Sequence, residues 1–327
     1  MATAVVSIAA RDVGFELLSV LLLWTAVAAF ISLAALDVWL ARHPLRLLRR
    51  AGQPGQGFHA LGFVADGCVL GVRIVSSGAI ARAIAEVLFA VGLGLSILIL
   101  GEVAKEHGRR GGNQPRGEWL LTVVATEGLA ILGARIAGLR HLPGLHATTT
   151  VLWLAGGLAY FIVGSLLVRR AAEPRFGLAD ITPDWWIVMG APAIWCTAAV
   201  AVTGAHPGTA GAAAAAVAWG LASLMLIVIA TTDALRARRF GIRFTPERWT
   251  MVFPLGMYCV ASWGLGRSLY AGWLADLARV WLWVALGAWA TVAVGELRHL
   301  LVGEWSGIKP KPRPEQPPPY RRHRAGG

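Results

Sequence analysis

The sequence predicts an all-α integral membrane protein in which ten transmembrane helices form five tandem helical hairpins. Hydrophobic residues make up 56% of the 327-residue chain and charged residues 15%, which leaves too little polar surface to cover a soluble domain of this size. Apolar runs of about 20 residues, long enough to cross a hydrocarbon layer of about 30 Å, recur along the whole chain. An internal repeat with a period of roughly 60 to 65 residues indicates a supersecondary unit copied in tandem.

The repeat is carried by five short segments that lie in apolar runs. Each segment begins with a bulky apolar residue followed by Ala, Gly or Pro. The segments are residues 1–7 (MATAVVS), 64–70 (VADGCVL), 124–130 (VATEGLA), 189–195 (MGAPAIW) and 253–259 (FPLGMYC). Because the period is longer than one helix and shorter than a domain, the repeated unit is predicted to be a membrane hairpin.

Ten helices follow in order from the hydropathy, two in each repeat. They are predicted at 1–11, 17–40, 58–75, 79–104, 117–138, 147–168, 184–203, 209–233, 247–266 and 277–301. The first helix of each pair carries the repeat motif, with small residues, Gly and Pro near its middle. The second helix has a plainer sequence rich in Leu, Ala and Val. This contrast predicts an inner ring of odd helices, whose small residues allow close approach, and an outer ring that faces lipid.

Two prolines, Pro192 and Pro254, lie inside odd helices, where each removes a backbone hydrogen bond and kinks the helix. Interrupted helices at the midplane are typical of transport pathways, and ordinary helix packing with tolerated prolines is the alternative. The candidate pore-lining or kink residues are Pro254, Gly256, Gly190, Pro192, Gly67, Gly128, Thr126 and Thr3.

The last two odd helices share a pattern at their starts. Thr182 and Thr245 are predicted N-caps, each followed by a first-turn proline and by an acid that the helix dipole favours. Tryptophans near the starts of three odd helices are predicted to anchor the cytoplasmic interface of the membrane. These are Trp119, Trp185, Trp186 and Trp249.

The net charge of +12 follows the positive-inside pattern. Arginines and lysines cluster after the second, fourth, sixth, eighth and tenth predicted helices. These connections and both termini are therefore predicted to face the cytoplasm, in a multi-pass protein of the inner membrane, and no nucleic-acid partner is needed to explain the charge. Residues 304–327, rich in Pro and Arg, are predicted to be a disordered cytoplasmic tail, which leaves 1–303 as the membrane domain.

No motif for catalysis, a metal or a cofactor is found. Cys68, Cys196 and Cys259 lie in predicted helices without the spacing of a disulfide or zinc site, and are expected to behave as small apolar residues. The chain also lacks a glycine-rich phosphate loop that ends in Lys-Ser/Thr. No catalytic residue, metal or cofactor is predicted. Structural ion pairs are predicted between Glu102 and Lys105, Asp233 and Arg236, and Arg82 and Glu86.

The five hairpins, the Thr-Pro-x-Trp starts and the Phe253-Pro254 pair in the ninth helix resemble the tellurite-resistance/dicarboxylate transporter family. That family includes bacterial C4-dicarboxylate and malate transporters and the plant slow-type guard-cell anion channels. The resemblance covers roughly residues 1–303, and it implies a transport domain with a quasi-fivefold pore inside each subunit, a homotrimer and anions as substrates. It also implies that Phe253 is the gate that occludes the pore, whereas in isolation this residue is a core or lipid-facing aromatic.

Two features depart from that family. The first repeat begins at Met1, which aligns with the middle of the other odd helices, so the first helix is predicted to be truncated, with the true start upstream or the pore wall damaged. Asp66 and Glu127 place acids near the middle of odd helices, where an ionisable group is costly unless it is protonated, paired or hydrated. They are candidates for proton-coupled uptake, and structural hydrogen bonding is the alternative.

Four arginines, Arg11, Arg73, Arg135 and Arg267, lie near the outer ends of four odd helices. A ring of guanidinium groups at a low-dielectric mouth would raise the local concentration of anions. Interfacial snorkelling, in which the charged heads simply reach water, explains the same residues equally well.

The leading hypothesis is therefore transport of small anions, either C4-dicarboxylates such as malate or inorganic anions, through a pore gated by Phe253. A proton-coupled carboxylate carrier that uses Asp66 and Glu127 is the alternative. A membrane-embedded enzyme is a remote one, because it would need paired carboxylates or a nucleophile with a base and no such cluster is present. A sensor or scaffold would be expected to carry a soluble signalling domain. The protein is predicted not to be an enzyme, and its partners to be small anions and the lipid bilayer.

Overall fold

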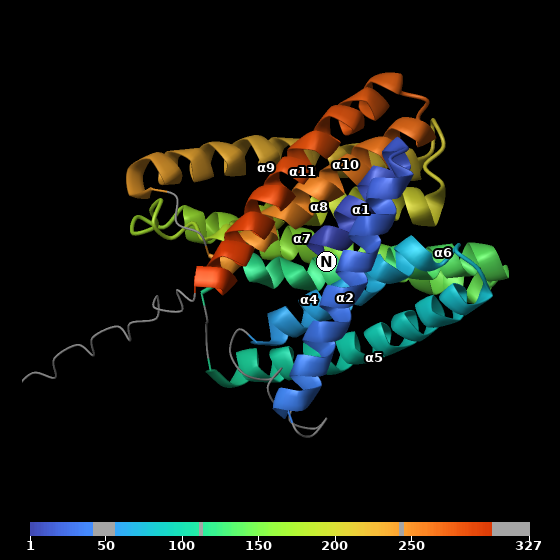
Figure 1. The fold of residues 1–327 in the computed structure, drawn as a ribbon, viewed down its shortest axis with the longest axis horizontal. Coiled ribbons are helices and arrows are strands. Elements are labelled where there is room, and N and C mark those ends of the chain that lie inside the picture. The colour runs from blue at the N-terminus through green and yellow to red at the C-terminus, as the bar shows by residue number, and fades with distance from the viewer. Residues whose placement is uncertain (42–55, 111–113, 242–244, 303–327) are drawn as a thin grey trace, which may run out of the picture.

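The computed structural model describes residues 1–41, 56–110, 114–241 and 245–302, and every regular element in these ranges is a helix. Figure 1 shows long helices packed into one bundle, with the N-terminus near its middle. The prediction of an all-α fold with ten long helices is confirmed for the described residues. The loop at 42–55 and the predicted tail at 304–327 lie outside them.

The ten long helices occur as consecutive pairs that pack against each other. The pairs are α1 (Ala2–Val13) with α2 (Glu16–Ala41), α4 (Gln56–Ile74) with α5 (Ala79–Arg110), α6 (Leu121–Arg140) with α7 (Pro143–Ala171), α8 (Ile187–Thr203) with α9 (Ala210–Phe240), and α10 (Trp249–Ser268) with α11 (Gly272–Val302). Three short 3₁₀ turns precede α6, α8 and α10, namely η1 (Gly117–Leu120), η2 (Pro183–Trp186) and η3 (Pro246–Arg248).

The first helices of the pairs contact one another in a closed order. α1 contacts α4, α4 contacts α6, α6 contacts α8, α8 contacts α10, and α10 returns to α1. Each second helix contacts its own partner and also the first helix of the next pair, so that α2 touches α4 and α11 touches α1. We call α1, α4, α6, α8 and α10 the inner helices and the other five the outer helices.

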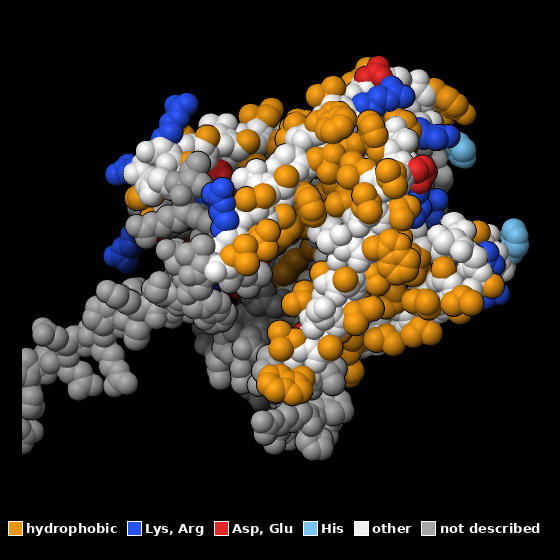
Figure 2. Space-filling view, in the orientation of Figure 1, with side chains coloured by type: hydrophobic (Ala, Val, Ile, Leu, Met, Phe, Trp, Pro, Cys, Tyr) orange, Lys and Arg blue, Asp and Glu red, His pale blue; other side chains and the backbone are white. Residues whose placement is uncertain are grey.

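Burial distinguishes the two sets. In the most apolar stretch of α6 and of α8, 83% and 72% of the residues are buried, whereas the corresponding shares in the five outer helices are 17% to 33%. Figure 2 shows hydrophobic side chains across the outward faces of α2, α5 and α11. Large side chains such as Leu17, Trp24 and Ile97 are more than half exposed there. A continuous apolar surface of this extent is suited to lipid.

Seven of the described helices are long and apolar enough to cross a membrane by length and composition alone. The other three, α1, α4 and α10, are all inner helices. The twelve residues of α1 reach only about 18 Å, and α4 and α10 carry polar residues such as Asp66, Arg73 and Arg267. Neighbouring helices cover Asp66 and Arg73, so the lower hydropathy of α4 does not bring these polar groups into lipid, whereas Arg267 is exposed in the last turn of α10.

The helix starts differ in detail from the prediction. Thr182 occupies the N-cap position of η2, but its hydroxyl hydrogen-bonds to Asp184 instead of capping the backbone. The Asp184 carboxylate accepts the backbone N–H of Glu118 in η1 at 3.2 Å, so it caps the neighbouring helix start. A Cβ atom on Gly117 would lie 2.4 Å from the carbonyl oxygen of Asp184, so only glycine fits this contact between η1 and η2.

Some of the predicted polar and aromatic positions are also corrected. Glu86 pairs with Arg140 of α6 at 2.7 Å rather than with Arg82, while Glu102–Lys105 and Asp233–Arg236 form as predicted. Trp185 and Trp186, which are predicted to anchor the membrane interface, are less than a tenth exposed, and η2, which carries them, contacts η1, α8 and α10. Cys68, Cys196 and Cys259 are free thiols buried in the inner helices, as expected of small apolar residues.

Candidate functional site

A cavity of about 830 Å³ opens among the starts of the inner helices. On α10 its wall is formed by Trp249, Thr250 and Phe253, which lie in the first turns of the helix. The other inner helices also contribute to the wall. Their contributions are Thr3 of α1, Asp66 of α4, Leu121 of α6 and Ile187 of α8. The cavity therefore reaches from the 3₁₀ turns to the level of Phe253, and its wall includes residues of all five inner helices together with Ala26, Ala29 and Leu33 of the outer helix α2.

Phe253 is only 1% exposed and is the largest of the fully buried side chains in the described part of the chain. It lies where the cavity wall on α10 ends, directly before the proline that interrupts this helix. The residues at the same repeat position in α4, α6 and α8 are Val64, Val124 and Met189, each of them at most 4% exposed. These positions are all apolar and buried, and Val64 packs toward the outer helix α5, where a Cβ on Gly92 would lie 3.3 Å from its Cγ1.

Acids outnumber bases around the cavity. The acids in its wall are Asp66, Glu118, Asp180, Asp184 and Glu247, and the positive groups are Arg116, Arg170 and the amino group of Met1. Asp66 lies near the middle of α4, and its Oδ1 lies 2.5 Å from the amino group of Met1. The structure thus places one of the two predicted intramembrane acids in the cavity wall.

The other acid, Glu127, lies elsewhere. Its side chain is 0% exposed and faces the outer helix α7, because a Cβ on Gly156 would stand 2.1 Å from Glu127 Oε1. Neither carboxyl oxygen has a hydrogen-bond partner among the described residues. The next residue along α7, Gly157, lies against the indole of Trp195, from which an added Cβ would be 2.8 Å away. Asp66 and Glu127 therefore do not share a site.

The eight predicted pore-lining or kink residues mostly form contacts between helices. Thr3 lines the cavity and accepts the indole N–H of Trp289 at 3.1 Å. Gly190 lies against the ring of Pro254, and a Cβ there would be 2.9 Å from its Cγ. Gly256 faces Val5 of α1 and Gly128 faces Cys68 of α4 in the same manner, whereas Gly67 faces Phe30 and Leu88 of the outer helices. Pro192 lies inside α8, and Thr126 bonds to the carbonyl of Thr122 in its own helix.

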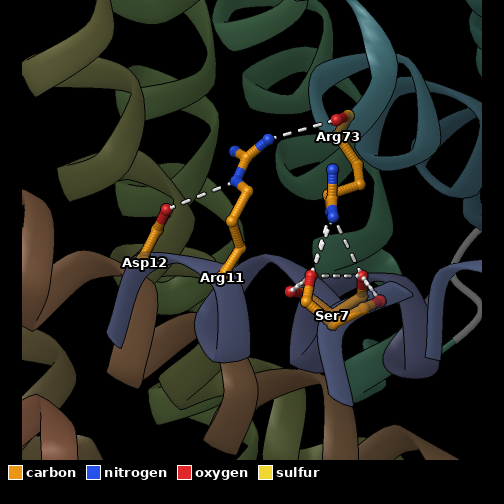
Figure 3. Close-up of polar contacts among 5 residues, drawn as sticks. Ser7, Arg11, Asp12 and Arg73 are labelled. Atoms are coloured by element: carbon orange, nitrogen blue, oxygen red, sulfur yellow. Dashed lines mark hydrogen bonds and ion pairs between the residues drawn. The ribbon is translucent and has the colours of Figure 1, made fainter. Parts of the chain in front are cut away.

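The four predicted arginines lie near the opposite ends of four inner helices, and one of them, Arg11, contacts a residue that the sequence did not single out, Asp12. Arg11 Nε lies 3.8 Å from Asp12 Oδ1, and Arg11 Nη1 donates to the backbone carbonyl of Arg73 at 3.2 Å (Figure 3). The four guanidinium groups come from α1, α4, α6 and α10.

Arg73 is the buried member of this group, with an exposed fraction of 6%. Its Nε and Nη2 donate to the hydroxyl of Ser19 at 3.2 and 2.9 Å, and Nε also reaches the hydroxyl of Ser7 at 3.3 Å. Each of these serines donates in turn to the backbone carbonyl of the other at 2.7 Å. Ser7 and Ser19 were missed by sequence reasoning; a polar residue in the apolar helix α2 was the available signal for Ser19.

In the described part of the chain, no group of three or more His, Cys, Asp or Glu side chains could hold a metal ion. The site consists instead of a cavity, a buried plug of apolar side chains and a cluster of arginines. With the apolar outer surface and the seven candidate spans, these features define a multi-pass helical membrane protein with polar groups gathered inside its helix bundle.

A family model described as SLAC1, voltage-dependent anion channel, matches residues 1–297 of the chain. The chain belongs to this family, which confirms the resemblance to the tellurite-resistance/dicarboxylate transporters inferred from the repeat. Members of the family are channels and transporters, and membership indicates transport of anions across a membrane.

Two curated relatives share part of the sequence. They are uncharacterized membrane proteins of Mycobacterium tuberculosis, from the strains CDC 1551 / Oshkosh and ATCC 25618 / H37Rv. Each is 32% identical to the chain over 150 residues, which is 43% of this chain and 76% of the relative. Both are described as membrane proteins, in agreement with the fold.

Proposed function

We propose that the protein is a channel-like transporter in which small anions, C4-dicarboxylates such as malate or inorganic anions, pass through a pore enclosed by the five inner helices. The closed order of contacts from α1 through α4, α6, α8 and α10 back to α1 supports a quasi-fivefold ring. The cavity, with wall residues from all five inner helices, is one half of the path in this proposal. The arginine cluster at the other helix ends is its basic mouth.

The observation that carries the proposal is the position of Phe253. Its ring is buried at the end of the cavity wall on α10, at a level where the other inner helices also present buried apolar side chains. A bulky side chain at that level closes the path sterically. The neighbouring contact of Pro254 with Gly190 gives α10 a local irregularity beside the ring, where movement would change the opening.

The test is anion current through purified protein in planar bilayers, comparing wild type with Phe253→Ala. We expect a large rise in conductance with reversal potentials set by the anion gradient, because the substitution removes the occluding ring. Phe240→Ala, at the exposed end of α9, is the matched control and should behave as wild type. Removing a buried Phe costs about 3–5 kcal/mol, so Phe253→Leu provides a second, milder variant that should give an intermediate conductance. Unchanged conductance in both folded Phe253 variants would reject the gate.

A second candidate function, proton-coupled carboxylate uptake, is favoured by Glu127. A fully buried carboxyl group without a hydrogen-bond partner is costly in its ionised form, which is a property of groups that exchange protons in membrane carriers. Uptake into liposomes that depends on an imposed pH gradient, and that is lost in Glu127→Gln or Asp66→Asn, would favour the carrier. Flux that is indifferent to the pH gradient would favour the channel.

We also propose the membrane arrangement that the charges suggest. The ends of α7 and α9 carry Arg169, Arg170, Arg238 and Arg239, on the side of the 3₁₀ turns, and this side faces the cytoplasm in the inner membrane under the positive-inside rule. A homotrimer is proposed from the family resemblance alone. Cysteine accessibility in intact cells tests the orientation, and native mass spectrometry tests the subunit number.

A further inference from the structure

We infer that a groove between α5, the end of α6 and the start of α7 binds an anionic phospholipid, whose phosphate group contacts Arg140 and Arg82. The inference goes beyond anion transport and does not depend on it. Because α6 starts at the 3₁₀ turn η1 and ends at Arg140, the lipid belongs to the leaflet on the side away from the 3₁₀ turns.

The groove is a second, open cavity of about 340 Å³. Its lining residues come from three successive long helices and are Glu86 and Phe89 of α5, Ile136 and Arg140 of α6, and Leu142 and Leu145 at the start of α7. The outer helices α5 and α7 each pack against α6, and their backbones do not contact each other in the described residues. The end of α6 therefore forms the floor of the groove.

The groove changes from apolar to charged along the helices. Toward the middle of the bundle it is closed at Gly133, where a Cβ would lie 2.5 Å from Thr149 Cγ2 and 2.8 Å from Phe89 Cε2. Phe89 and Ile136 form an apolar wall, and Glu86 and Arg140 lie nearer the ends of the helices.

The surface next to the groove is also apolar. Ile84 and Val87 of α5 and Leu142 at the start of α7 are each about half exposed or more. A charged end above an apolar surface matches a phospholipid, whose headgroup and acyl chains are joined in the same order. A free anion would leave the apolar wall without a partner.

Arg140 is fixed in this groove and keeps donors for a ligand. Its Nε donates to Glu86 Oε1 at 2.7 Å, and its Nη2 donates to Glu86 Oε2 at 3.2 Å. This bidentate pair sets the plane of the guanidinium group and leaves both N–H groups of Nη1 for another acceptor. The Arg140 side chain is 47% exposed, so a headgroup has access to it.

Arg82 supplies a second positive charge and a donor without an acceptor. It lies four residues before Glu86, so the two side chains share one face of α5, with Arg82 a turn nearer the helix start. Arg82 Nε is buried and has no hydrogen-bond partner in the described part of the chain. A buried donor without a partner is destabilising, and a phosphate oxygen in the groove would satisfy it.

The charges predict which lipid is preferred. Two arginines and one glutamate leave a net positive charge, which favours an anionic headgroup over a zwitterionic one. One basic residue near the membrane surface changes the affinity for an anionic lipid by about fivefold. We therefore expect Arg140→Gln and Arg82→Gln each to weaken binding of anionic lipid about fivefold, and Glu86→Gln to strengthen it by a similar factor.

The experiment titrates the full chain in detergent with phosphatidylglycerol or with phosphatidylcholine of the same acyl chains. Native mass spectrometry measures the half-saturating lipid concentration, and the rise of the unfolding temperature is the second readout. Arg279→Gln and Asp276→Asn are the matched controls, because they break an exposed ion pair near the start of the outer helix α11, on the same side of the bundle as the start of α5. Neither control should change the preference between the two lipids.

Tighter binding of phosphatidylglycerol, weakened in both arginine variants and strengthened in Glu86→Gln, supports the inference. Arg140→Gln and Glu86→Gln break the same ion pair, so a pair that only holds α5 to α6 predicts the same change in both, and that result would overturn the inference. Equal affinity of the wild type for the two lipids would overturn it as well. If inorganic phosphate displaces the lipid and raises the unfolding temperature as much, the groove binds a free anion and the lipid inference is wrong. Should Arg140→Gln not fold, Arg82→Gln breaks no hydrogen bond and carries the same test.

Discussion

Replacing Gly156 by alanine tests the placement of Glu127 between α6 and α7. The added Cβ would lie 2.1 Å from Oε1, 2.7 Å from Cδ and 3.0 Å from Cγ of Glu127. Turning the carboxyl group alone would not relieve the contact, because the side chain is too close from its γ-carbon onward. The whole side chain or the spacing of the two helices must change, and Glu127 has no exposed surface into which it could swing.

The expected cost is that of overpacking a core, about 1–3 kcal/mol, which lowers the ratio of folded to unfolded protein by about 5- to 150-fold. Gly164→Ala is the control on the same helix, since a Cβ there meets nothing within 4 Å. Both variants gain the same helix propensity, up to about 1 kcal/mol, so the difference between their stabilities isolates the clash.

Equilibrium unfolding in mixed detergent micelles measures both variants. The double variant Glu127→Ala/Gly156→Ala should recover the loss, because the clashing atoms are gone, and the coupling between the two sites should be of the same size as the clash. If Gly156→Ala were as stable as Gly164→Ala, the side chain of Glu127 would point away from α7. The carboxyl group would then be free to face the pore, and the proton-coupled candidate would gain support.

Two further predictions concern the inner ring. Ser19→Ala should lower the free energy of unfolding by about 1–3 kcal/mol, because the carbonyl of Ser7 and the guanidinium of Arg73 lose buried partners. Ser165→Ala is the control and should be near neutral in the same unfolding assay, because the Ser165 hydroxyl bonds only within its own exposed turn. Gly190→Ala should also destabilise the protein by about 1–3 kcal/mol, because the added Cβ would lie 2.9 Å from Cγ, 3.1 Å from Cβ and 3.3 Å from Cα of Pro254. Gly220→Ala in α9 is the control and should not destabilise it, because a Cβ there meets nothing within 4 Å. Equal stability of these two glycine variants would show that α8 and α10 are not in close contact beside Phe253.

The helices were predictable because hydropathy and the repeat report on position along the chain. The alternation of motif-bearing and plainer helices followed from the same repeat, because the motif recurs in the first helix of each pair. The direction of a single side chain was not predictable in this way. Successive residues of a helix point about 100° apart, so Glu127 faces Gly156 of α7 and Gly128 faces Cys68 of α4 although the repeat aligns them as one motif.

The arginines likewise show that the sequence does not predict which side chains of different helices meet. Arg11, Arg73, Arg135 and Arg267 were found as basic residues near helix ends, but their offsets from the repeat differ by several residues. Only the packing of α1 against α4 shows that Arg11 reaches the backbone carbonyl of Arg73 and also contacts Asp12. Ser7 and Ser19 form their pair across a hairpin, and no local pattern in either helix predicts that contact.

Charge differs between the two sides of Phe253. Along α10 it stands one turn beyond Trp249 in the cavity wall, whereas Arg267 lies fourteen residues further on, about 21 Å at 1.5 Å per residue. The cavity wall toward the 3₁₀ turns carries five carboxylates against two arginines and the amino group of Met1, while Arg11, Arg73, Arg135 and Arg267 lie near the other ends of the inner helices. In the proposed pore these four arginines would attract an anion and the carboxylates of the cavity would repel it. In the proposed pore the ring of Phe253 would close the path between these two potentials, so opening it would release an anion from an attractive site into a repelling one, which favours departure over rebinding.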